Sequence, residues 1–299
     1  MTKSLYKNKY AWILLVASVI WGFAFSAQVF AAQKGLGSFA FNGTRFFIGG
    51  LALVPVVFCL ERKPNGYSMQ KHTVLPAIGA GVIMYVAVNL QQLGIDMTHS
   101  AGKASFITGL YIVLVPILSL VLFRRRAGVF VWIGAFVAVV GLYLLGVEPN
   151  VGIELGDLLV LVAAVLWACH ILWVDRFVER ANPIRFSMVQ FFVCGILGLC
   201  TAFFVEDVTV TALLDAKWEI LYAGIISSGI GYTCQIIGQK GVPPTPAAMI
   251  MSMESVFGAL GGVLFAGERL PARVWLGCAL MFAGIILSQV KRKESVGNE

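Results

Sequence analysis

The chain of 299 residues contains ten apolar stretches, each long enough to cross a lipid bilayer as a helix. A transmembrane helix needs about 20 predominantly apolar residues to cross the hydrocarbon core. The ten stretches cover residues 10–32, 38–59, 73–94, 101–122, 129–147, 155–175, 184–205, 218–238, 246–265 and 271–290. Hydrophobic residues make up 59% of the chain and charged residues 12%, against about 45–50% and about 25% in soluble domains. The sequence therefore predicts an all-α membrane protein with ten transmembrane helices. The first apolar run is too long for a signal peptide, so we expect it to be retained.

The chain also repeats itself at an offset of 143 residues. Residues 131–134, which read VWIG, return as residues 274–277, which read VWLG, each time after a charged corner. The register holds without a gap from Ala104, which matches Ala247, to Leu144, which matches Leu287. Internal repeats are examined early because a missed repeat leads to a wrong fold assignment.

Each copy of the repeat contains five of the predicted spans. The first five-helix repeat covers residues 10–147 and the second covers residues 155–290. Because five is odd, the second copy enters the membrane from the opposite side and is inverted. Inverted repeats fold alike but face opposite ways, and a site at their interface can be reached from either side by related motions. The sequence thus predicts two inverted repeats around a central cavity.

Basic residues are distributed unevenly across this topology. The chain carries a net charge of +7, and positive residues beside membrane spans report orientation. With the N-terminus inside and ten spans, sixteen lysines and arginines fall on the cytoplasmic side and five on the opposite side. The sequence therefore predicts cytoplasmic N- and C-termini, and it does not favour nucleic-acid binding.

Signatures of cofactors and metals are missing from the sequence. The six cysteines all lie within predicted spans and form no Cys-x-x-Cys pair, so we interpret them as small buried apolar residues. No Gly-x-x-x-x-Gly-Lys-Ser/Thr motif is present, which excludes this type of nucleotide-binding loop. His170 lies inside a span, whereas His72 and His99 belong to loops on opposite sides. We therefore predict no metal site and no cofactor.

Glu254 and Arg45 are the charged residues that lie well inside predicted spans. A charge at the bilayer centre costs at least about 2.5–3.5 kcal/mol, so it requires an interior partner or a function. Glu254 lies near the middle of its span, and Tyr111 precedes it by the repeat offset of 143 residues. If the copies are pseudo-symmetric, Glu254 and Tyr111 occupy mirrored positions beside one cavity. Glu254 is then either a buried carboxylate held by neighbouring donors, or a group that binds a cationic or amino group or carries a proton. For Arg45 we expect a structural role, with its side chain extended to water; a substrate contact is the alternative.

Polar residues follow helical spacing in two spans that are equivalent in the two copies. One stripe consists of Tyr85, Asn89 and Gln92 in span 73–94. The other consists of Ser228, Tyr232 and Gln235 in span 218–238, together with Gln239 directly after it. Residues spaced by three, four or seven positions share one helix face, and Gln92 aligns with Gln235 at the repeat offset. Matched stripes in both copies favour a water-accessible cavity, and hydrogen bonding between helices is the alternative.

Two further spans add aromatic residues to the candidate site. Trp21, Phe25 and Gln28 share a face of the first span, and Trp167 and His170 share a face of the sixth. Aromatic rings stack on substrates or cationic groups, although they also serve ordinary packing, and His170 has a hydrogen-bonded packing role as its alternative. The candidate substrate-binding residues are Glu254, Tyr111, Gln92, Gln235, Asn89, Tyr85, Tyr232, Trp21, Trp167, His170 and Gln28, with Glu254 also the candidate for proton coupling.

Several short segments resemble the EamA-type branch of the drug/metabolite transporter superfamily. The resembling segments are residues 21–25 (WGFAF), 45–46 (RF), 102–108 (GKASFIT), 253–260 (MESVFGAL) and 267–270 (GERL). Together with the ten spans and the inverted repeat, they extend over almost the whole chain. One departure concerns Glu254, which matches a carboxylate that commonly starts a Glu-Pro pair in this family. Here Ser255 replaces the proline, so the usual kink and a hinge at this position are in doubt.

The resemblance implies ten helices arranged around a central cavity in the cytoplasmic (inner) membrane. It also implies transport of small metabolites, often amino acids or related compounds, out of the cell. Our leading hypothesis is a secondary active or facilitative transporter, expected to be an exporter, that works by alternating access. Its partners would be a small-molecule substrate, the lipid bilayer and, as a candidate coupling ion, the proton; a monomer is favoured. The alternatives are a membrane-embedded enzyme, which would need clustered acids or metal ligands at one membrane face, and a scaffold or receptor that does not transport.

Overall fold

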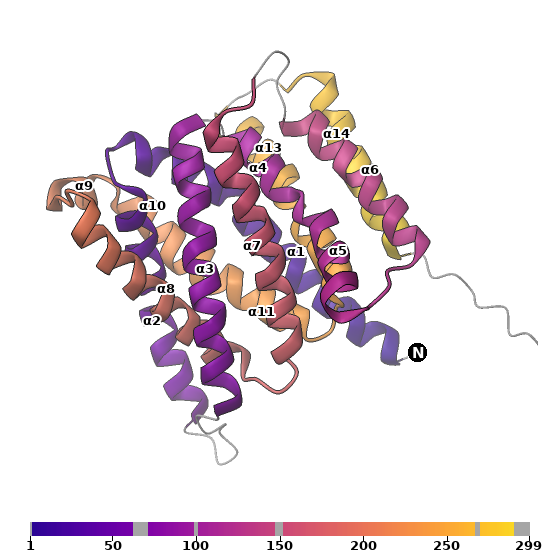
Figure 1. Ribbon diagram of the computed structural model, residues 1–299, viewed down its shortest axis with the longest axis horizontal. Coiled ribbons are helices and arrows are strands. Elements are labelled where there is room, and N and C mark those ends of the chain that lie inside the picture. The colour runs from indigo at the N-terminus through magenta and orange to yellow at the C-terminus, as the bar shows by residue number, and fades with distance from the viewer. Residues whose placement is uncertain (1, 62–70, 99–100, 147–151, 267–269, 290–299) are drawn as a thin grey trace, which may run out of the picture.

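The computed structural model describes residues 2–61, 71–98, 101–146, 152–266 and 270–289. All regular elements in these ranges are helices (Figure 1). They are α1 (Thr2–Gln33), α2 (Ser38–Glu61), α3 (Lys71–Thr98), α4 (Ala101–Gly109), α5 (Tyr111–Phe123), α6 (Val129–Gly146), α7 (Leu155–Phe177), α8 (Pro183–Val205), α9 (Val210–Asp215), α10 (Lys217–Leu221), the π-helix η1 (Tyr222–Tyr232), α11 (Thr233–Gln239), α12 (Pro244–Met251), α13 (Glu254–Ala266) and α14 (Ala272–Gln289). The all-α class predicted from the sequence is thereby confirmed.

Eight segments of the described chain are long and apolar enough to cross a membrane. They are Lys9–Gln33, Ser38–Cys59, Thr73–Thr98, Gly102–Phe123, Val129–Gly146, Leu155–Phe177, Pro183–Val205 and Lys217–Gln239. Ala272–Ser288 is a shorter apolar helix, and the predicted span 246–265 falls on α12 and α13. Ten crossings remain a prediction. The 267–270 segment of the resemblance lies almost entirely outside the described residues.

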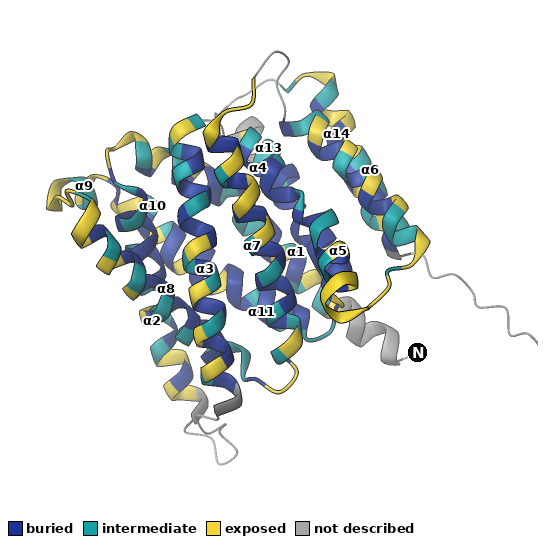
Figure 2. Cartoon of the chain, in the orientation of Figure 1, coloured by how far each residue is buried: buried dark blue, intermediate teal, exposed yellow. Residues whose placement is uncertain are grey.

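The exposed surface of the helices is apolar, and the interior contains polar side chains among a larger number of apolar ones. Phe203 and Phe204 on α8 are 80% and 81% exposed, and Phe136 on α6 is 69% exposed. Buried side chains include glutamines and two arginines, Arg45 and Arg185. Figure 2 shows exposed strips along the outer faces of helices whose opposite faces are buried. Large exposed apolar side chains on this scale mark contact with an apolar environment. The outer faces of these helices are therefore suited to lipid.

Glycines bring α6 and α14 into close backbone contact. The two helices run side by side in Figure 1. A methyl group added at Gly141 would lie 2.6 Å from the carbonyl oxygen of Gly277, and Gly134 faces Gly284 in the same way. The repeat offset relates Gly134 to Gly277 and Gly141 to Gly284. The Gly134–Gly284 and Gly141–Gly277 contacts are therefore equivalent to each other in the two copies. Small residues allow this approach in lipid, where no hydrophobic effect drives helices together.

We expect Gly141→Leu to destabilise the protein, because its side chain would be forced against the backbone of α14. Overpacking of this kind costs about 1–3 kcal/mol. Gly128→Leu is the matched control, since a methyl group added at Gly128 meets no atom within 4 Å. The measurement is the thermal unfolding midpoint of both purified variants in detergent. Equal midpoints would contradict the close α6–α14 packing.

Two of the predicted spans are broken at equivalent positions. Span 101–122 divides into α4 and α5 at Leu110, and span 246–265 divides into α12 and α13 at Ser252 and Met253. Leu110 donates its backbone N–H to Ile107 (3.2 Å), and Met253 donates to Ile250 (3.1 Å); both partners are related by the 143-residue offset. The expectation that Ser255 leaves this helix without a kink is wrong, because the helix breaks here without a proline. Backbone bonds to the third preceding residue tighten the chain at both points.

Candidate substrate cavity

A cavity lies at the centre of the helices, next to both breaks. It is lined from α1, α2, α3, α4, α5, α7, η1, α11, α12 and α13, and has a volume of about 50 Å³. A cavity of this size holds a few water molecules. Seven of the predicted site residues line it: Trp21, Gln28, Tyr111, Trp167, Tyr232, Gln235 and Glu254.

Tyr111 and Glu254 contact each other across this cavity. The Tyr111 hydroxyl donates to Glu254 Oε1 at 3.3 Å, and both side chains are buried. Tyr111 is the first residue of α5, and Glu254 is the first residue of α13. The helix N-terminus favours the negative charge of a carboxylate. The repeat offset predicted only that these two residues lie beside one cavity. The structure shows in addition that they are hydrogen-bonded to each other.

Gly22 allows α1 to lie against the start of α13. A methyl group added at Gly22 would lie 2.7 Å from the backbone nitrogen of Gly258 and 2.8 Å from the carbonyl oxygen of Glu254. Only glycine permits this approach without moving α13. The Trp21-Gly22 pair thus places an indole and the Glu254 carboxylate around the same cavity.

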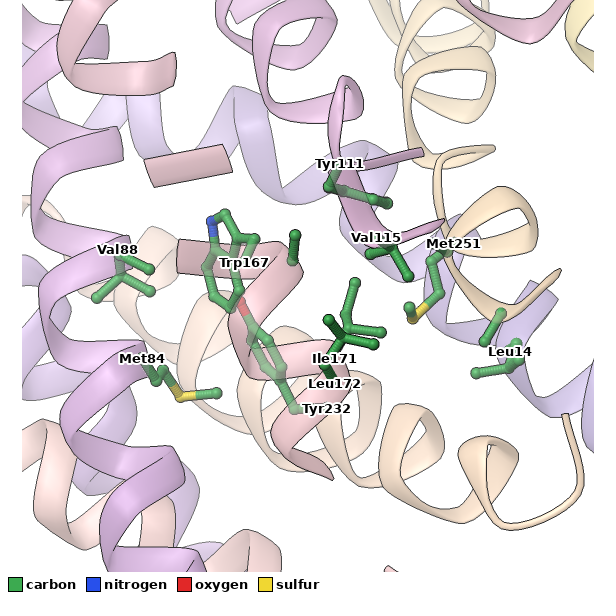
Figure 3. Close-up of a cluster of buried hydrophobic side chains, with 14 of the residues drawn as sticks. Leu14, Met84, Val88, Tyr111, Val115, Trp167, Ile171, Leu172, Tyr232 and Met251 are labelled. Carbon is green, nitrogen blue, oxygen red and sulfur yellow. The ribbon is translucent and has the colours of Figure 1, made fainter. Parts of the chain in front are cut away.

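Three aromatic rings form one wall of the cavity. Tyr232 packs against Trp21, with ring centroids 4.6 Å apart, and stacks on Trp167 at 5.8 Å. Figure 3 shows Trp167 and Tyr232 next to each other, with Tyr111 and Met251 on the other side of the view. The indole N–H of Trp21 donates to the Ser227 carbonyl oxygen (3.2 Å), and that of Trp167 donates to Gln91 Oε1 (3.2 Å). These bonds fix the orientation of both indoles at the cavity.

Two glutamines supply hydrogen-bond acceptors to the cavity. Gln28 Oε1 and Gln235 Oε1 are buried and have no partner within the described part of the chain. Their amide nitrogens are engaged: Gln28 donates to the Ala24 carbonyl oxygen (3.3 Å) and Gln235 donates to Gln239 Oε1 (3.1 Å). A buried polar atom without a partner costs about 1–3 kcal/mol. A ligand or water that donates to these oxygens would remove this cost.

The structure places the predicted α3 stripe outside the cavity. Asn89 accepts a hydrogen bond from Asn42 of α2 (3.0 Å), and the Tyr85 hydroxyl bonds Thr201 of α8 (2.5 Å). Gln92 donates to Asp96 Oδ1 (2.9 Å) on its own helix. For Tyr85 and Asn89, the alternative of hydrogen bonding between helices therefore describes the observed contacts.

His170 also lies outside the cavity lining. Its Nε2 bonds Gln190 Oε1 of α8 at 3.2 Å, and its ring packs edge-on against Trp167. His170 is fully buried. These contacts are those of the hydrogen-bonded packing role.

Several lining residues were not among the predicted site residues. They are Ala24, Phe25, Arg45, Gln91, Thr108, Ile171, Ser227 and Met251. Gln91 donates to the Thr108 hydroxyl (3.0 Å), which joins α3 to α4 beside the cavity. Gln91 adjoins Gln92 in the sequence, and helical spacing alone does not distinguish which of the two faces inward. Arg45, for which a side chain extended to water was expected, is 3% exposed and lines the cavity instead.

Comparison with known proteins adds the family context. The model of the EamA-like transporter family matches residues 8–147 and again residues 154–289. An uncharacterized transporter of Archaeoglobus fulgidus is 27% identical over 281 residues, which cover 93% of this chain and 85% of the relative. The uncharacterized transporter YwfM of Bacillus subtilis is 26% identical over 293 residues, 96% of each chain. The threonine/homoserine exporter RhtA of Escherichia coli is 26% identical over 262 residues, 82% of this chain and 81% of the relative.

A solved structure supports the fold independently. One crystal structure superimposes with a TM-score of 0.78 at 18% identity, covering 97% of this chain and 99% of its own. At this identity the likeness concerns the fold alone.

Proposed function

Because this chain belongs to the EamA-like transporter family, we propose that it exports a small polar metabolite such as an amino acid by alternating access, with the central cavity as the substrate site. The family and the names of its relatives identify the chain as a membrane transporter and not an enzyme. The amino-acid class and the outward direction draw on RhtA, a relative named as an exporter of threonine and homoserine.

The observation that carries the proposal is the hydrogen bond between Tyr111 and Glu254. The two residues are equivalent in the two copies, each begins a helix after a break, and both line the cavity. Broken helices near the midplane of inverted repeats are where many secondary transporters bind their substrates. The mirrored contacts of Gly134 with Gly284 and of Gly141 with Gly277 support the same two-fold relation.

The composition of the cavity supports a small polar substrate with an apolar part. Glu254, Gln28 and Gln235 offer acceptors, and the wall of Trp21, Tyr232 and Trp167 offers apolar faces. The cavity volume of about 50 Å³ is below the range of about 300–1,000 Å³ typical of pockets for drug-sized ligands. Admission of a metabolite therefore requires the helices to separate, as alternating access supposes.

The proposed location is the cytoplasmic membrane, with both termini in the cytoplasm. The bacterial and archaeal relatives named as transporters favour this membrane, and the excess of basic residues on the side of the termini favours this orientation. Residues 10–147 and 155–290 would then be the two inverted repeats of a protein that functions as a monomer.

Counterflow in proteoliposomes tests the proposal. Vesicles loaded with an unlabelled L-amino acid should take up the same labelled compound faster than protein-free vesicles, and the test panel is L-threonine, L-homoserine, L-phenylalanine, L-lysine and L-glutamate. Absence of counterflow for the whole panel would contradict the proposed substrate class.

We expect Trp167→Ala to reduce this counterflow by about tenfold or more, because it removes the ring that stacks on Tyr232 in the cavity wall. Aromatic contacts contribute about 0.5–1.5 kcal/mol beyond area burial, and tenfold in affinity corresponds to about 1.4 kcal/mol. Trp218→Ala is the matched control, since Trp218 is 70% exposed on α10 and outside the cavity lining. Size-exclusion chromatography of both variants establishes that they fold. Equal rates for the two folded variants would argue against the cavity as the substrate site.

A further inference from the structure

Arg45 is a buried cation at the edge of the central cavity. It lies in α2, is 3% exposed and lines the cavity. Its guanidinium carbon lies 4.7 Å from the ring centroid of Phe46 and 5.2 Å from that of Phe41. The rings hold the guanidinium by cation–π contacts, a geometry for which arginine is well suited.

No carboxylate of the described chain pairs with Arg45. The ion pairs among the described residues join Lys34 to Glu219, Lys103 to Asp157, and Arg125 to Asp175. Arg45 Nε is buried without a hydrogen-bond partner in the same part of the chain. An arginine remains charged in a protein, and a buried charge is normally paired. An anionic group in the cavity would supply the missing partner.

The second copy of the repeat does not need a charge at this position. Residues 45–50 read RFFIGG and residues 190–195 read QFFVCG, an offset of 145. Phe46 and Phe191, which this offset relates, pack against each other with centroids 5.9 Å apart. Arg45 thus corresponds to Gln190, an uncharged residue that bonds His170. Arg45 of α2 and Gln190 of α8 thus hold equivalent positions on the two sides of one helix interface, and only the first carries a charge.

The cavity therefore contains one basic and one acidic side chain. Arg45 comes from the first copy and Glu254 from the second, and neither forms an ion pair with the other within the described structure. Tyr232 borders both groups, since it lines the cavity with Glu254 and its ring lies 5.7 Å from that of Phe46. A lone cation would be repelled by Arg45 and a lone anion by Glu254. A ligand with both charges adds no net charge to the low-dielectric interior.

We propose that Arg45 is the anion-binding residue of the cavity and that the substrate is a zwitterion, whose carboxylate is bound by Arg45 and whose ammonium group is bound by Glu254. This inference rests on the proposed function of the cavity as the substrate site. Arg45 would then select substrates that carry a carboxylate, because the guanidinium offers paired N–H donors that match the two carboxylate oxygens.

The test compares three forms of one compound in the counterflow assay. The compound is the panel amino acid that the wild-type protein exchanges fastest, used together with its carboxamide, which lacks the negative charge, and its N-acetyl derivative, which lacks the positive charge. Each derivative competes against the labelled amino acid, and the ratio of inhibition constants measures the preference for the intact zwitterion.

In the wild-type protein the amino acid should inhibit about 10- to 100-fold more strongly than its carboxamide, as expected for a charge-assisted hydrogen-bonded contact. Arg45→Gln should reduce this preference to less than about threefold, while the preference over the N-acetyl derivative persists. Arg45→Lys keeps the charge without the planar pair of donors and should give an intermediate ratio. Arg125→Gln, which alters a half-exposed arginine outside the cavity lining, should leave both ratios unchanged.

The outcomes separate the inference from the proposed function. An unchanged preference over the carboxamide in Arg45→Gln, with slower exchange of all ligands, would mean that Arg45 is structural and would overturn the inference alone. If Arg45→Gln does not fold, the ratio in Arg45→Lys decides the question, and a wild-type ratio there overturns the inference. Failure of the wild-type protein to exchange any amino acid of the panel would overturn both proposals.

Discussion

We expect Glu254→Gln to abolish uptake driven by a pH gradient across reconstituted vesicles, while exchange of substrate continues at a lower rate because the amide oxygen can still accept a hydrogen bond from an ammonium group. Glutamine has nearly the shape of glutamate, and its amide oxygen can still accept the hydrogen bond from the Tyr111 hydroxyl, which is 3.3 Å long. Glutamine cannot take up or release a proton. If Glu254 is the proton carrier, the variant therefore retains a formed cavity but loses coupling to the proton gradient.

Asp175→Asn is the matched control for this experiment. Asp175 lies near the end of α7, outside the cavity lining, and pairs with the half-exposed Arg125 at 2.7 Å. Exposed ion pairs contribute about 0–1 kcal/mol, so the loss of this carboxylate should leave proton-driven uptake intact. Proton-driven uptake at the wild-type rate in Glu254→Gln would eliminate Glu254 as the coupling residue.

A disulfide between positions 105 and 255 should arrest transport reversibly. Ser105 of α4 and Ser255 of α13 are buried, and their hydroxyl oxygens lie 2.5 Å apart. Cysteine sulfurs at these positions would be within reach of a disulfide bond. The link would join a helix of the first repeat to a helix of the second beside Glu254. Alternating access requires the repeats to move relative to each other, so we expect the oxidised Ser105→Cys, Ser255→Cys variant to fall to the level of protein-free vesicles.

Reduction of the disulfide should restore counterflow in the same vesicles. The double variant is made in a background whose six native cysteines are replaced, because all six described cysteines are free thiols and two of them, Cys59 and Cys200, are exposed. The single Ser105→Cys variant, treated with the same oxidant, controls for the loss of the serine hydrogen bond. Unchanged counterflow in fully oxidised protein would show that α4 and α13 stay together throughout the cycle.

The 143-residue repeat predicted that Tyr111 and Glu254 lie beside one cavity, and the structure adds a hydrogen bond between them. A residue that contacts its own equivalent must lie on the axis relating the two copies, and Tyr111 and Glu254 do contact each other. This prediction needed no side-chain detail, because a symmetric arrangement of similar sequences brings equivalent positions together at their interface. Glu254 was recognisable for an additional reason, since lipid excludes charges that lack an interior environment.

The polar stripe of α3 illustrates what helical spacing leaves open. Tyr85, Asn89 and Gln92 do share a face, yet this face contacts neighbouring helices, and Gln91 lines the cavity. Spacing identifies residues that point in one direction, but the rotation of a helix about its axis is set by packing against all its neighbours. Arg45 was misjudged for the same reason: depth along the helix favoured a side chain extended to water, whereas the fold directs the arginine to the cavity.

The sequence by itself determined the helical class, the 143-residue repeat and the equivalence of Tyr111 and Glu254, because lipid imposes long apolar helices and a repeated sequence gives equivalent positions. The tertiary structure alone decided where the helices break, which face of each helix lines the cavity, and that Arg45 shares the cavity with Glu254. These features depend on close contacts between segments far apart in the chain, such as Gly22 with Gly258 and Phe46 with Phe191. No local pattern encodes such contacts, since they arise only when all the helices pack together.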